Sequence, residues 1–291
     1  MLILKGHTAP VHAVAYSPDG RYLASGGDDH AVIVWDLAAG KALTTLGEHT
    51  DCVNAVVFTS QDGCLATGGW DKKLCLWNPH ARRRLLRSWT LPEWVWSLAY
   101  APDGWALAAG LLTGEIILYP GGPKSHPQTL TGHSYPVTSL AFSPNGRVLA
   151  SAGQDRTVRL WTAEFSRILG TLTGHTDWVR SVAFAPNGDL LASAGDDAVI
   201  RLWNPTEQRE LAALQGHCGV VRQIAFSPDG RTLLSVSWDE TVRIWDVTSG
   251  KERGVLDWKI GRVNAVVFAP DGMTAAAAGH DHSVVIWDVD L

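Results

Sequence analysis

The sequence predicts an all-β protein of seven four-stranded antiparallel sheets arranged radially, a seven-bladed β-propeller. Three observations predict it: an aromatic residue recurs every 42 residues, each unit reads as four short strands, and seven such units account for nearly all of the 291 residues. The recurring aromatics are Trp35, Trp77, Tyr119, Trp161, Trp203, Trp245 and Trp287. A sheet of this kind cannot bury both faces alone, whereas seven in a ring bury each face against a neighbour.

The fifth repeat shows how the strands are assigned. Strand-like runs cover residues 179–184, 191–193 and 199–203, and a fourth run precedes the next Gly-His pair. Pro-Asp-Gly or Pro-Asn-Gly segments between runs predict tight hairpin turns, because proline presets φ and glycine accepts a positive φ. In the first run the apolar residues fall at offsets of three and then two, which breaks strict alternation and predicts a β-bulge that redirects Arg180.

The two ends of the chain predict how the ring closes. The chain begins with residues 2–7, Leu-Ile-Leu-Lys-Gly-His, which match the fourth-strand segment of other repeats, and it ends at the third strand of the last repeat. The N-terminal strand is therefore expected to complete blade seven. We interpret residues 1–291 as a single domain of seven repeats, which would suit the recognition domain of a larger signalling or sensor protein.

Composition narrows the class of protein. The chain is 46% hydrophobic and 18% charged, with a formal net charge of −5, so its overall charge gives no reason to bind nucleic acid or an anionic membrane. Its four cysteines follow no Cys-x-x-Cys spacing, and neither a signal peptide nor a membrane-spanning run is found. We expect a cytoplasmic protein without cofactors, monomeric as an isolated domain.

A Gly-His pair near the start of most repeats and a Trp-Asp pair near the end of several give the chain a resemblance to the WD40 repeat family over its whole length. The resemblance implies a buried hydrogen-bond chain of His, Ser or Thr, Asp and Trp in each blade. Five blades carry all four members, which we call the tetrads: His7, Ser25, Asp29 and Trp35; His49, Thr67, Asp71 and Trp77; His133, Ser151, Asp155 and Trp161; His175, Ser193, Asp197 and Trp203; His217, Ser235, Asp239 and Trp245.

The tetrads are interpreted as structural elements and not as catalytic triads. An indole N–H can only donate a hydrogen bond, whereas a hydroxyl or an imidazole can both donate and accept. A carboxylate ends the chain as acceptor. Because the five tetrads are each buried behind a tryptophan, we expect them to be unreactive. Blade three departs from the pattern with Leu91, Ala109, Thr113 and Tyr119, and blade seven keeps Asp281 and Trp287 but has Lys259 and Ala277.

The resemblance also implies a partner surface on one rim of the ring, the top rim. WD40 domains present side chains there from the bulged first strand and from the turn before the tetrad Asp. Transferred through the period, these positions give the candidate partner-binding residues Trp70, Trp94, Trp96, Trp178, Trp238, Arg180, Arg222, Arg262, Asn54, Asn264, Gln154 and Asp196, together with His12, His280 and Asp28. Aromatic and Arg side chains are enriched at interface hot spots.

The leading hypothesis is a non-catalytic scaffold that binds a protein or peptide on this rim. Two alternatives stay open at this point. The first is a propeller enzyme or a metal site near His12, His280 and His282, and the second is stacking of nucleic-acid bases on the aromatic rim, which the acidic balance disfavours.

Overall fold

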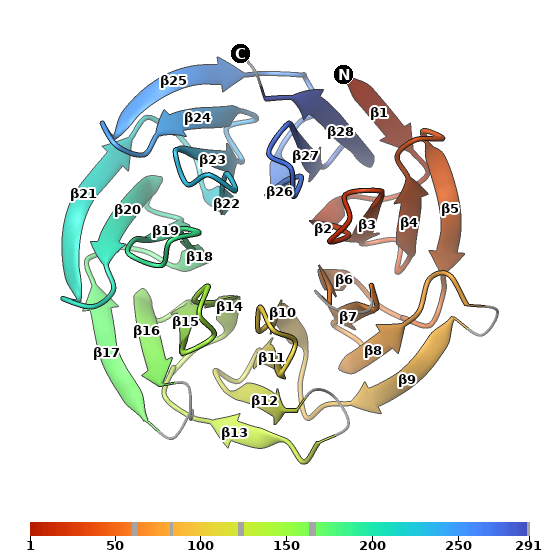
Figure 1. Cartoon of the computed structure of the whole chain (residues 1–291), viewed down its shortest axis with the longest axis horizontal. Helices are drawn as coiled ribbons and strands as arrows, with labels where there is room; N and C mark the ends of the chain where they lie inside the picture. The colour runs from red at the N-terminus through yellow and green to blue at the C-terminus, as the bar shows by residue number, and fades with distance from the viewer. Residues whose placement is uncertain (60–62, 82–83, 122–124, 163–166, 290–291) are drawn as a thin grey trace.

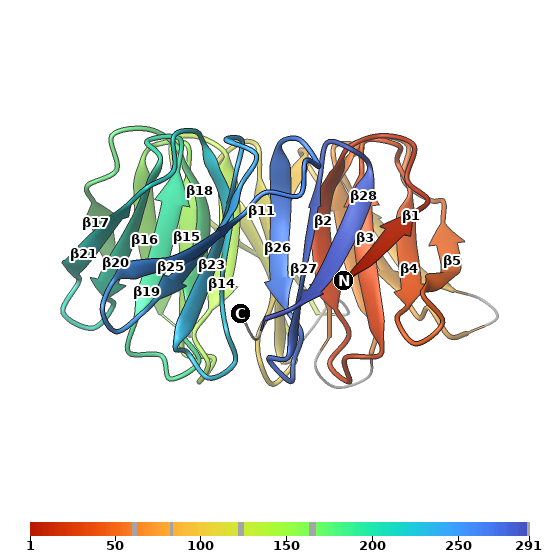
Figure 2. The same ribbon diagram turned by 90° about the horizontal axis from the view of Figure 1, so that it is seen from above.

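The computed structural model describes residues 1–59, 63–81, 84–121, 125–162 and 167–289. Across these residues 28 strands form seven four-stranded antiparallel sheets. The sheets are the blades of a ring around a central axis (Figure 1), and their strands run between the two faces of a disc (Figure 2). The predicted seven-bladed β-propeller is confirmed. The described residues contain no helix long and apolar enough to cross a membrane.

Each blade runs from an innermost strand at the axis to an outermost strand at the periphery (Figure 1). The innermost strands are β2 (Val11–Tyr16), β6 (Val53–Phe58), β10 (Val95–Tyr100), β14 (Val137–Phe142), β18 (Val179–Phe184), β22 (Val221–Phe226) and β26 (Val263–Phe268). The second strands are β3 (Tyr22–Gly27), β7 (Leu65–Gly69), β11 (Ala106–Leu111), β15 (Val148–Gly153), β19 (Leu191–Gly195), β23 (Thr232–Ser237) and β27 (Thr274–Gly279). The third strands are β4 (Val32–Asp36), β8 (Lys73–Trp77), β12 (Ile116–Pro120), β16 (Thr157–Thr162), β20 (Val199–Asn204), β24 (Val242–Asp246) and β28 (Ser283–Asp288). The outermost strands are β5 (Lys41–Leu46), β9 (Leu85–Thr90), β13 (Gln128–Leu130), β17 (Ile168–Thr173), β21 (Arg209–Gln215), β25 (Lys251–Leu256) and β1 (Leu2–Lys5).

Blades one to six follow chain order from β2–β5 to β22–β25, and blade seven combines both ends of the chain. Its strand order is β26, β27, β28 and β1. Strand β1 pairs antiparallel with β28, with Leu2 opposite Ile286 and Lys5 opposite Ser283. The predicted closure by the N-terminal strand is therefore confirmed.

The hairpin turns have the backbone geometry that their sequences predict. In the turn of blade one, Gly20 has a φ of 69° and its N–H donates to the Ser17 carbonyl at 2.9 Å. The Ser17 hydroxyl donates to Asp19 Oδ1 at 2.6 Å, which fixes the turn locally. The equivalent Gly146 and Gly230 have φ values of 68° and 72°. Glycine is required here because other residues rarely adopt a positive φ.

Every innermost strand carries the predicted bulge. The register shifts by one residue at the same position of each repeat, for example between Val179 and Ser181 in blade five. The extra residue has no partner in the ladder, so its side chain is redirected. These seven residues, here called the bulge residues, are His12, Asn54, Trp96, Thr138, Arg180, Arg222 and Asn264.

The hydrophobic core lies between neighbouring blades. One cluster brings Leu4 and Val284 of blade seven against Val11 and Leu23 of blade one, all with 1% or less of their surface exposed. Because the blades share such clusters all around the ring, each sheet buries both faces. The core therefore holds the innermost strands in fixed positions around the axis.

Candidate functional site

The tetrads are buried hydrogen-bond chains that fix the top edge of five blades. In blade five, Trp203 Nε1 donates to Ser193 Oγ at 2.8 Å, and Ser193 Oγ lies 2.7 Å from His175 Nε2. His175 Nδ1 lies 2.9 Å from Asp197 Oδ2, which also accepts the Thr176 backbone N–H. Because indole only donates, Ser193 accepts there and donates to Nε2, which leaves the Nδ1 proton for Asp197.

The other four tetrads repeat these contacts. Tryptophan donates to the hydroxyl at 2.8 or 2.9 Å, and each hydroxyl lies 2.7 Å from histidine Nε2. Burial opposes ionisation of Asp197, but the hydrogen bond from His175 and two backbone N–H groups outweigh it and lower the pKa of Asp197. The tetrad hydroxyls have no exposed surface, so no substrate reaches them.

The two departing blades lack this chain. In blade seven, Trp287 Nε1 is buried without a hydrogen-bond partner, because the equivalent of the tetrad Ser is Ala277. Asp281 accepts from the Ser283 hydroxyl at 2.7 and 2.8 Å, and the exposed Lys259 side chain pairs with Asp257. In blade three Tyr119 is buried, and burial raises the pKa of its hydroxyl.

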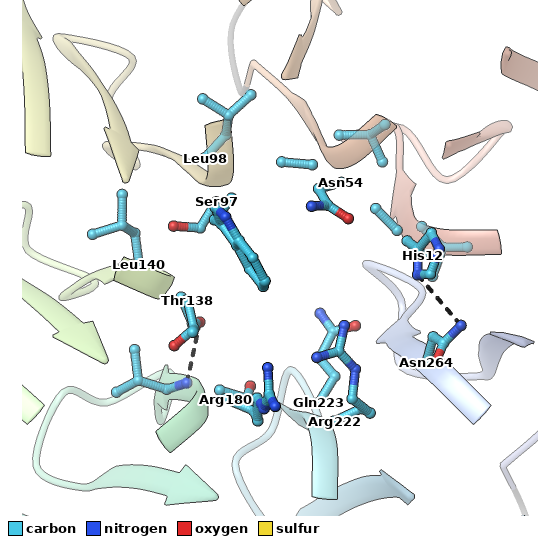
Figure 3. A pocket seen from close by; sticks show the side chains of 18 of the residues that line it. His12, Asn54, Ser97, Leu98, Thr138, Leu140, Arg180, Arg222, Gln223 and Asn264 are labelled. Atoms are coloured by element: carbon cyan, nitrogen blue, oxygen red, sulfur yellow. Dashed lines mark hydrogen bonds between the residues drawn. The ribbon is translucent and has the colours of Figure 1, made fainter. Parts of the chain in front are cut away.

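The bulge residues surround a cavity of about 190 Å³ on the axis, here called the mouth. Figure 3 shows side chains from several blades around its open centre, with Arg180 and Arg222 on one side and Asn54 across from them. Sequence reasoning missed Thr138 as a lining residue, although it occupies the same repeat position as the others. Its hydroxyl donates to the Ala152 carbonyl at 3.1 Å and so serves the fold.

The five candidate rim tryptophans differ in exposure. Trp178 is 41% exposed, whereas the other four are half-buried. Trp70 stacks on Trp94 with ring centroids 5.1 Å apart and lies 6.1 Å from Trp96. In blade six Trp238 Nε1 donates to Asn264 Oδ1 at 3.1 Å. The other four tryptophans therefore make contacts with residues of the rim itself.

A further aromatic on this rim escaped sequence reasoning. Tyr135 of blade four is 60% exposed and lies one residue before Pro136, the repeat equivalent of Trp178. It lies before an innermost strand, as Trp178 does, but at the repeat position of Asp177, so the positions transferred through the period did not include it. Among the described residues, no other Phe, Tyr or Trp side chain is as exposed as Tyr135 and Trp178.

The rim arginines have different partners. Arg180 donates from Nε and Nη2 to the two oxygens of Asp196 at 2.5 and 2.8 Å, and its guanidinium lies 4.8 Å from the Trp178 ring centroid. Arg222 and Arg262 lie 5.5 and 5.1 Å from the Trp238 ring centroid. Among the residues that the structure describes, Arg222 forms no ion pair, and its Nε is buried without a partner.

Three more buried donors of the rim have no acceptor. They are Asn54 Nδ2, Trp70 Nε1 and Trp96 Nε1. Asn54 Oδ1 lies 3.5 Å from the Cys52 Sγ atom. Buried polar groups are nearly always paired, and four of the nine unpaired buried atoms among the described residues belong to this rim. The remaining candidate, Gln154, is half-buried and turns its backbone N–H to the Pro136 carbonyl at 3.0 Å.

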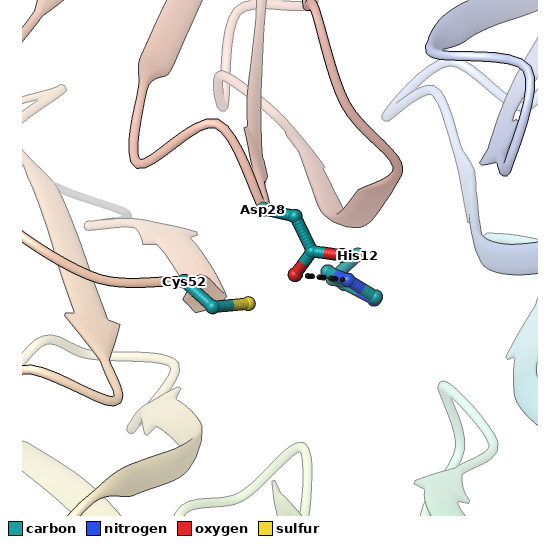
Figure 4. Close-up of side chains that lie close together, drawn as sticks. All are labelled: His12, Asp28 and Cys52. Atoms are coloured by element: carbon teal, nitrogen blue, oxygen red, sulfur yellow. Dashed lines mark ion pairs between the residues drawn. The ribbon is translucent and has the colours of Figure 1, made fainter.

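The titratable cluster differs from the histidine set considered in the sequence. His12 Nε2 lies 2.9 Å from Asp28 Oδ1, and one ligand atom each of His12, Asp28 and Cys52 falls within 4.8 Å of the others (Figure 4). His280 acts electrostatically on His12, whereas His282 acts on His7. Among the described residues, the group of possible metal ligands contains His12 but neither His280 nor His282.

Electrostatics around this cluster oppose a bound cation. Burial lowers the pKa of His12, and the Arg222 charge acts in the same direction. Burial raises the pKa of the Cys52 thiol, and a hydrogen bond to Asp28 adds to that effect. With a protonated thiol and a nearby guanidinium, the cluster is satisfied as a hydrogen-bonded group.

Comparison with known proteins agrees with the repeat pattern. The family model for the WD domain, G-beta repeat, matches residues 1–36, 40–78, 124–162, 166–204, 208–246 and 251–288. The unmatched stretch contains most of blade three, whose tetrad positions are substituted. Blade three is thus divergent in sequence while its four strands keep the same order as in the other blades.

Curated relatives match over about one repeat. The chain is 58% identical over 43 residues to the small ribosomal subunit protein RACK1z of Arabidopsis thaliana, covering 15% of this chain and 13% of that protein. It is 42% identical over 45 residues to the ribosome biogenesis protein BOP1 homolog of Drosophila virilis, covering 16% of this chain and 6% of that protein. Because the family model matches well over half of the sequence, the chain belongs to the WD40 repeat family.

Proposed function

We propose that this chain is a non-catalytic scaffold that binds a protein or peptide on its top rim. The observation that carries the proposal is the exposure of two aromatic side chains, Tyr135 at 60% and Trp178 at 41%, on the rim of adjacent blades. Exposed aromatic surface is unfavourable unless something covers it, and Tyr and Trp are the residues that most often anchor an interface.

The surroundings of Trp178 support a protein partner. The Arg180 guanidinium lies over the Trp178 ring and is held in place by Asp196, so both side chains are ordered before a partner arrives. Ordered anchors lose less conformational entropy on binding. The WD40 fold itself supports a protein-interaction scaffold.

The chemistry of the tetrads supports a non-catalytic role. The hydroxyls of Ser25 and Ser193 have no exposed surface and already donate to histidine. A nucleophile needs access to a substrate as well as an adjacent base. These groups therefore act as structural hydrogen bonds between strands.

Charge and cysteine chemistry suggest the partner class and the compartment. A net charge of −5 favours a protein or peptide over nucleic acid or an anionic membrane, since those polyanions attract basic surfaces. Cys52, Cys75 and Cys218 are free thiols, as is usual in the cytoplasm. The ribosomal relatives match over about one repeat, which is the length of a single blade. Such a match says nothing about the rim as a whole, so we infer the partner class from the side chains of the rim.

The test is affinity capture from a cell lysate with immobilised protein, comparing wild type with Trp178→Ala and Tyr135→Ala. Leu211→Ala is the matched control, because Leu211 is 46% exposed on β21, the outermost strand of blade five. A captured protein should be lost with the two rim variants and kept with the control. Loss with Leu211→Ala alone would move the binding surface to the outer edge of the blades and overturn the proposal.

A further inference from the structure

The bulge residue and the residue 16 positions after it face each other within a blade. In blade five they are Arg180 and Asp196, which form a two-point ion pair. In blade one they are His12 and Asp28, whose closest side-chain atoms are 2.9 Å apart. In these two blades a carboxylate at that position contacts the basic side chain of the bulge residue.

Blade six has the basic side chain without the carboxylate. Its bulge residue is Arg222, and the position that holds Asp in blades one and five holds Trp238. The guanidinium lies over the indole ring, and its Nε is buried and unpaired. Burial, together with the nearby Arg180 charge, lowers the pKa of Arg222 to about 10, although the Asp196 carboxylate of the neighbouring blade acts in the opposite direction.

Two further residues that line the mouth, Asn54 and Trp96, carry unpaired donors. Asn54 Nδ2 and Trp96 Nε1 are buried and have no acceptor. The oxygens of the lining side chains are used inside the protein: Gln223 Oε1 accepts from the Val266 backbone N–H at 3.0 Å, and similar bonds engage Asn54, Ser139, Ser181 and Asn264. The mouth therefore offers donors, and an occupant must bring acceptors.

The size of the mouth limits that occupant. Its volume of about 190 Å³ is below the roughly 300–1,000 Å³ that usually holds a drug-sized molecule. It fits a short side chain that enters from the rim, where Arg180 and Arg222 stand next to each other around the axis (Figure 3).

We propose that the mouth binds the carboxylate of an aspartate or glutamate side chain in a peptide that lies across the top rim. Arg222 supplies the counter-charge, and Asn54 and Trp96 donate to the same carboxylate. The carboxylate takes the part that Asp196 plays for Arg180 in blade five. This inference rests on the proposed function, since it assigns one anchor residue of the partner.

The first experiment uses glutarate as a probe, in isothermal titration calorimetry on the full chain. Glutarate carries the carboxylate without a peptide, and its neutral diamide is the chemical control. Wild type should bind glutarate saturably and the diamide at least 10-fold more weakly. Arg222→Gln should reduce glutarate affinity at least 10-fold, and Arg222→Lys should retain part of it. The matched control is Arg253→Gln, an exposed arginine on β25 of the same blade.

A second variant tests the internal carboxylate directly. Asp196→Asn removes the counter-ion of Arg180, so a second guanidinium becomes available to the probe. Glutarate affinity should rise several-fold, whereas an unchanged affinity would show that the Arg180–Asp196 pair has a purely structural role; circular dichroism detects unfolding. A fall in affinity with an intact fold would contradict the proposal.

The outcomes separate this inference from the proposed function. Glutarate binding that is absent, or that survives Arg222→Gln, overturns the inference, and rim-dependent capture of a partner then still supports the scaffold. Glutarate binding through Arg222 without any rim-dependent partner supports the carboxylate site and overturns the scaffold. Inorganic phosphate that binds at least 10-fold more tightly than glutarate overturns the choice of a carboxylate.

Discussion

Arg180 and Asp196 form a two-point ion pair in blade five, and the same two positions one repeat later carry Arg222 and Trp238. The side chains of the ion pair are 8% and 15% exposed, so each charge depends on the other. Arg180 therefore stabilises the fold through its ion pair, whereas Arg222, in the equivalent position, has no such pair.

Arg180→Gln should destabilise the protein while Arg222→Gln should not. Removal of Arg180 leaves the Asp196 carboxylate half-buried without its partner, which costs about 1–3 kcal/mol. Removal of Arg222 loses a contact with Trp238 but also a cation without a counter-ion, so the free energy of unfolding should change by less than about 1 kcal/mol. Denaturant unfolding measures both, and a larger loss for Arg222→Gln would contradict this assignment.

The tetrads predict a difference between two identical substitutions. Trp203→Phe removes the donor to Ser193 inside a buried polar chain, whereas Trp287→Phe removes an indole N–H that has no partner. Both variants lose similar apolar surface, so that contribution cancels in the comparison. We expect Trp203→Phe to be the more destabilising by about 1–3 kcal/mol in denaturant unfolding. Equal losses would show that the hydrogen bond contributes little.

Deletion of residues 2–5 tests the closure of the ring. The deletion removes β1 from blade seven, exposes the edge of β28, and uncovers the buried Leu4 pocket. An open edge favours pairing with other chains, so the truncated protein should melt at a lower temperature or aggregate. Thermal unfolding and size-exclusion chromatography measure the two effects. As a control, Ile3→Thr keeps the strand and changes a side chain that is 46% exposed.

The buried histidines predict a loss of stability in acid. Burial lowers the pKa of His7 and His12 from 6.5, and hydrogen bonds lower the pKa of Asp29 and Asp71 from 3.8 against the effect of burial. In each case the unfolded chain binds protons more readily than the folded one. The stabilising contribution is therefore complete above about pH 7 and falls with pH, first through the histidines and below pH 3.8 through the carboxyls.

Free energies of unfolding measured from pH 8 to pH 3 check this profile. A stability that stays constant between about pH 7 and pH 5 would show that the histidines titrate alike in both states. In a His7→Gln variant the upper part of the slope should shrink, because one of the imidazoles whose pKa is lowered by burial is gone.

The backbone of this protein could be predicted from one period. The spacing of Trp35 and Trp77 located the blades, and the apolar offsets around Arg180 located the bulges, because both depend on local rules that repeat every 42 residues. The stacking of Trp70 on Trp94 could not be predicted, since it depends on how side chains from neighbouring loops settle against each other.

The side-chain pairs of the rim could be predicted in part. Asp196 and Arg180 occupy the same repeat positions as Asp28 and His12. The 42-residue period therefore located the residues of the ion pair but did not show that they are in contact. Cys52 contacts the His12 group from the neighbouring blade, and no rule within one repeat connects the two. Sequence reasoning thus reached the positions of the rim but not the contacts that cross between blades.

The pairing of β1 with β28 also dictates an order of events during synthesis. Residues 2–5 are made before their partner strand, 283–288, and six complete blades lie between the two in the chain. Until then β1 has no partner, and contacts this distant in sequence are the slowest to form. Ring closure therefore cannot precede the synthesis of β28, so the nascent chain keeps an unpaired strand, open to chaperones or to strand exchange, until the last blade is made.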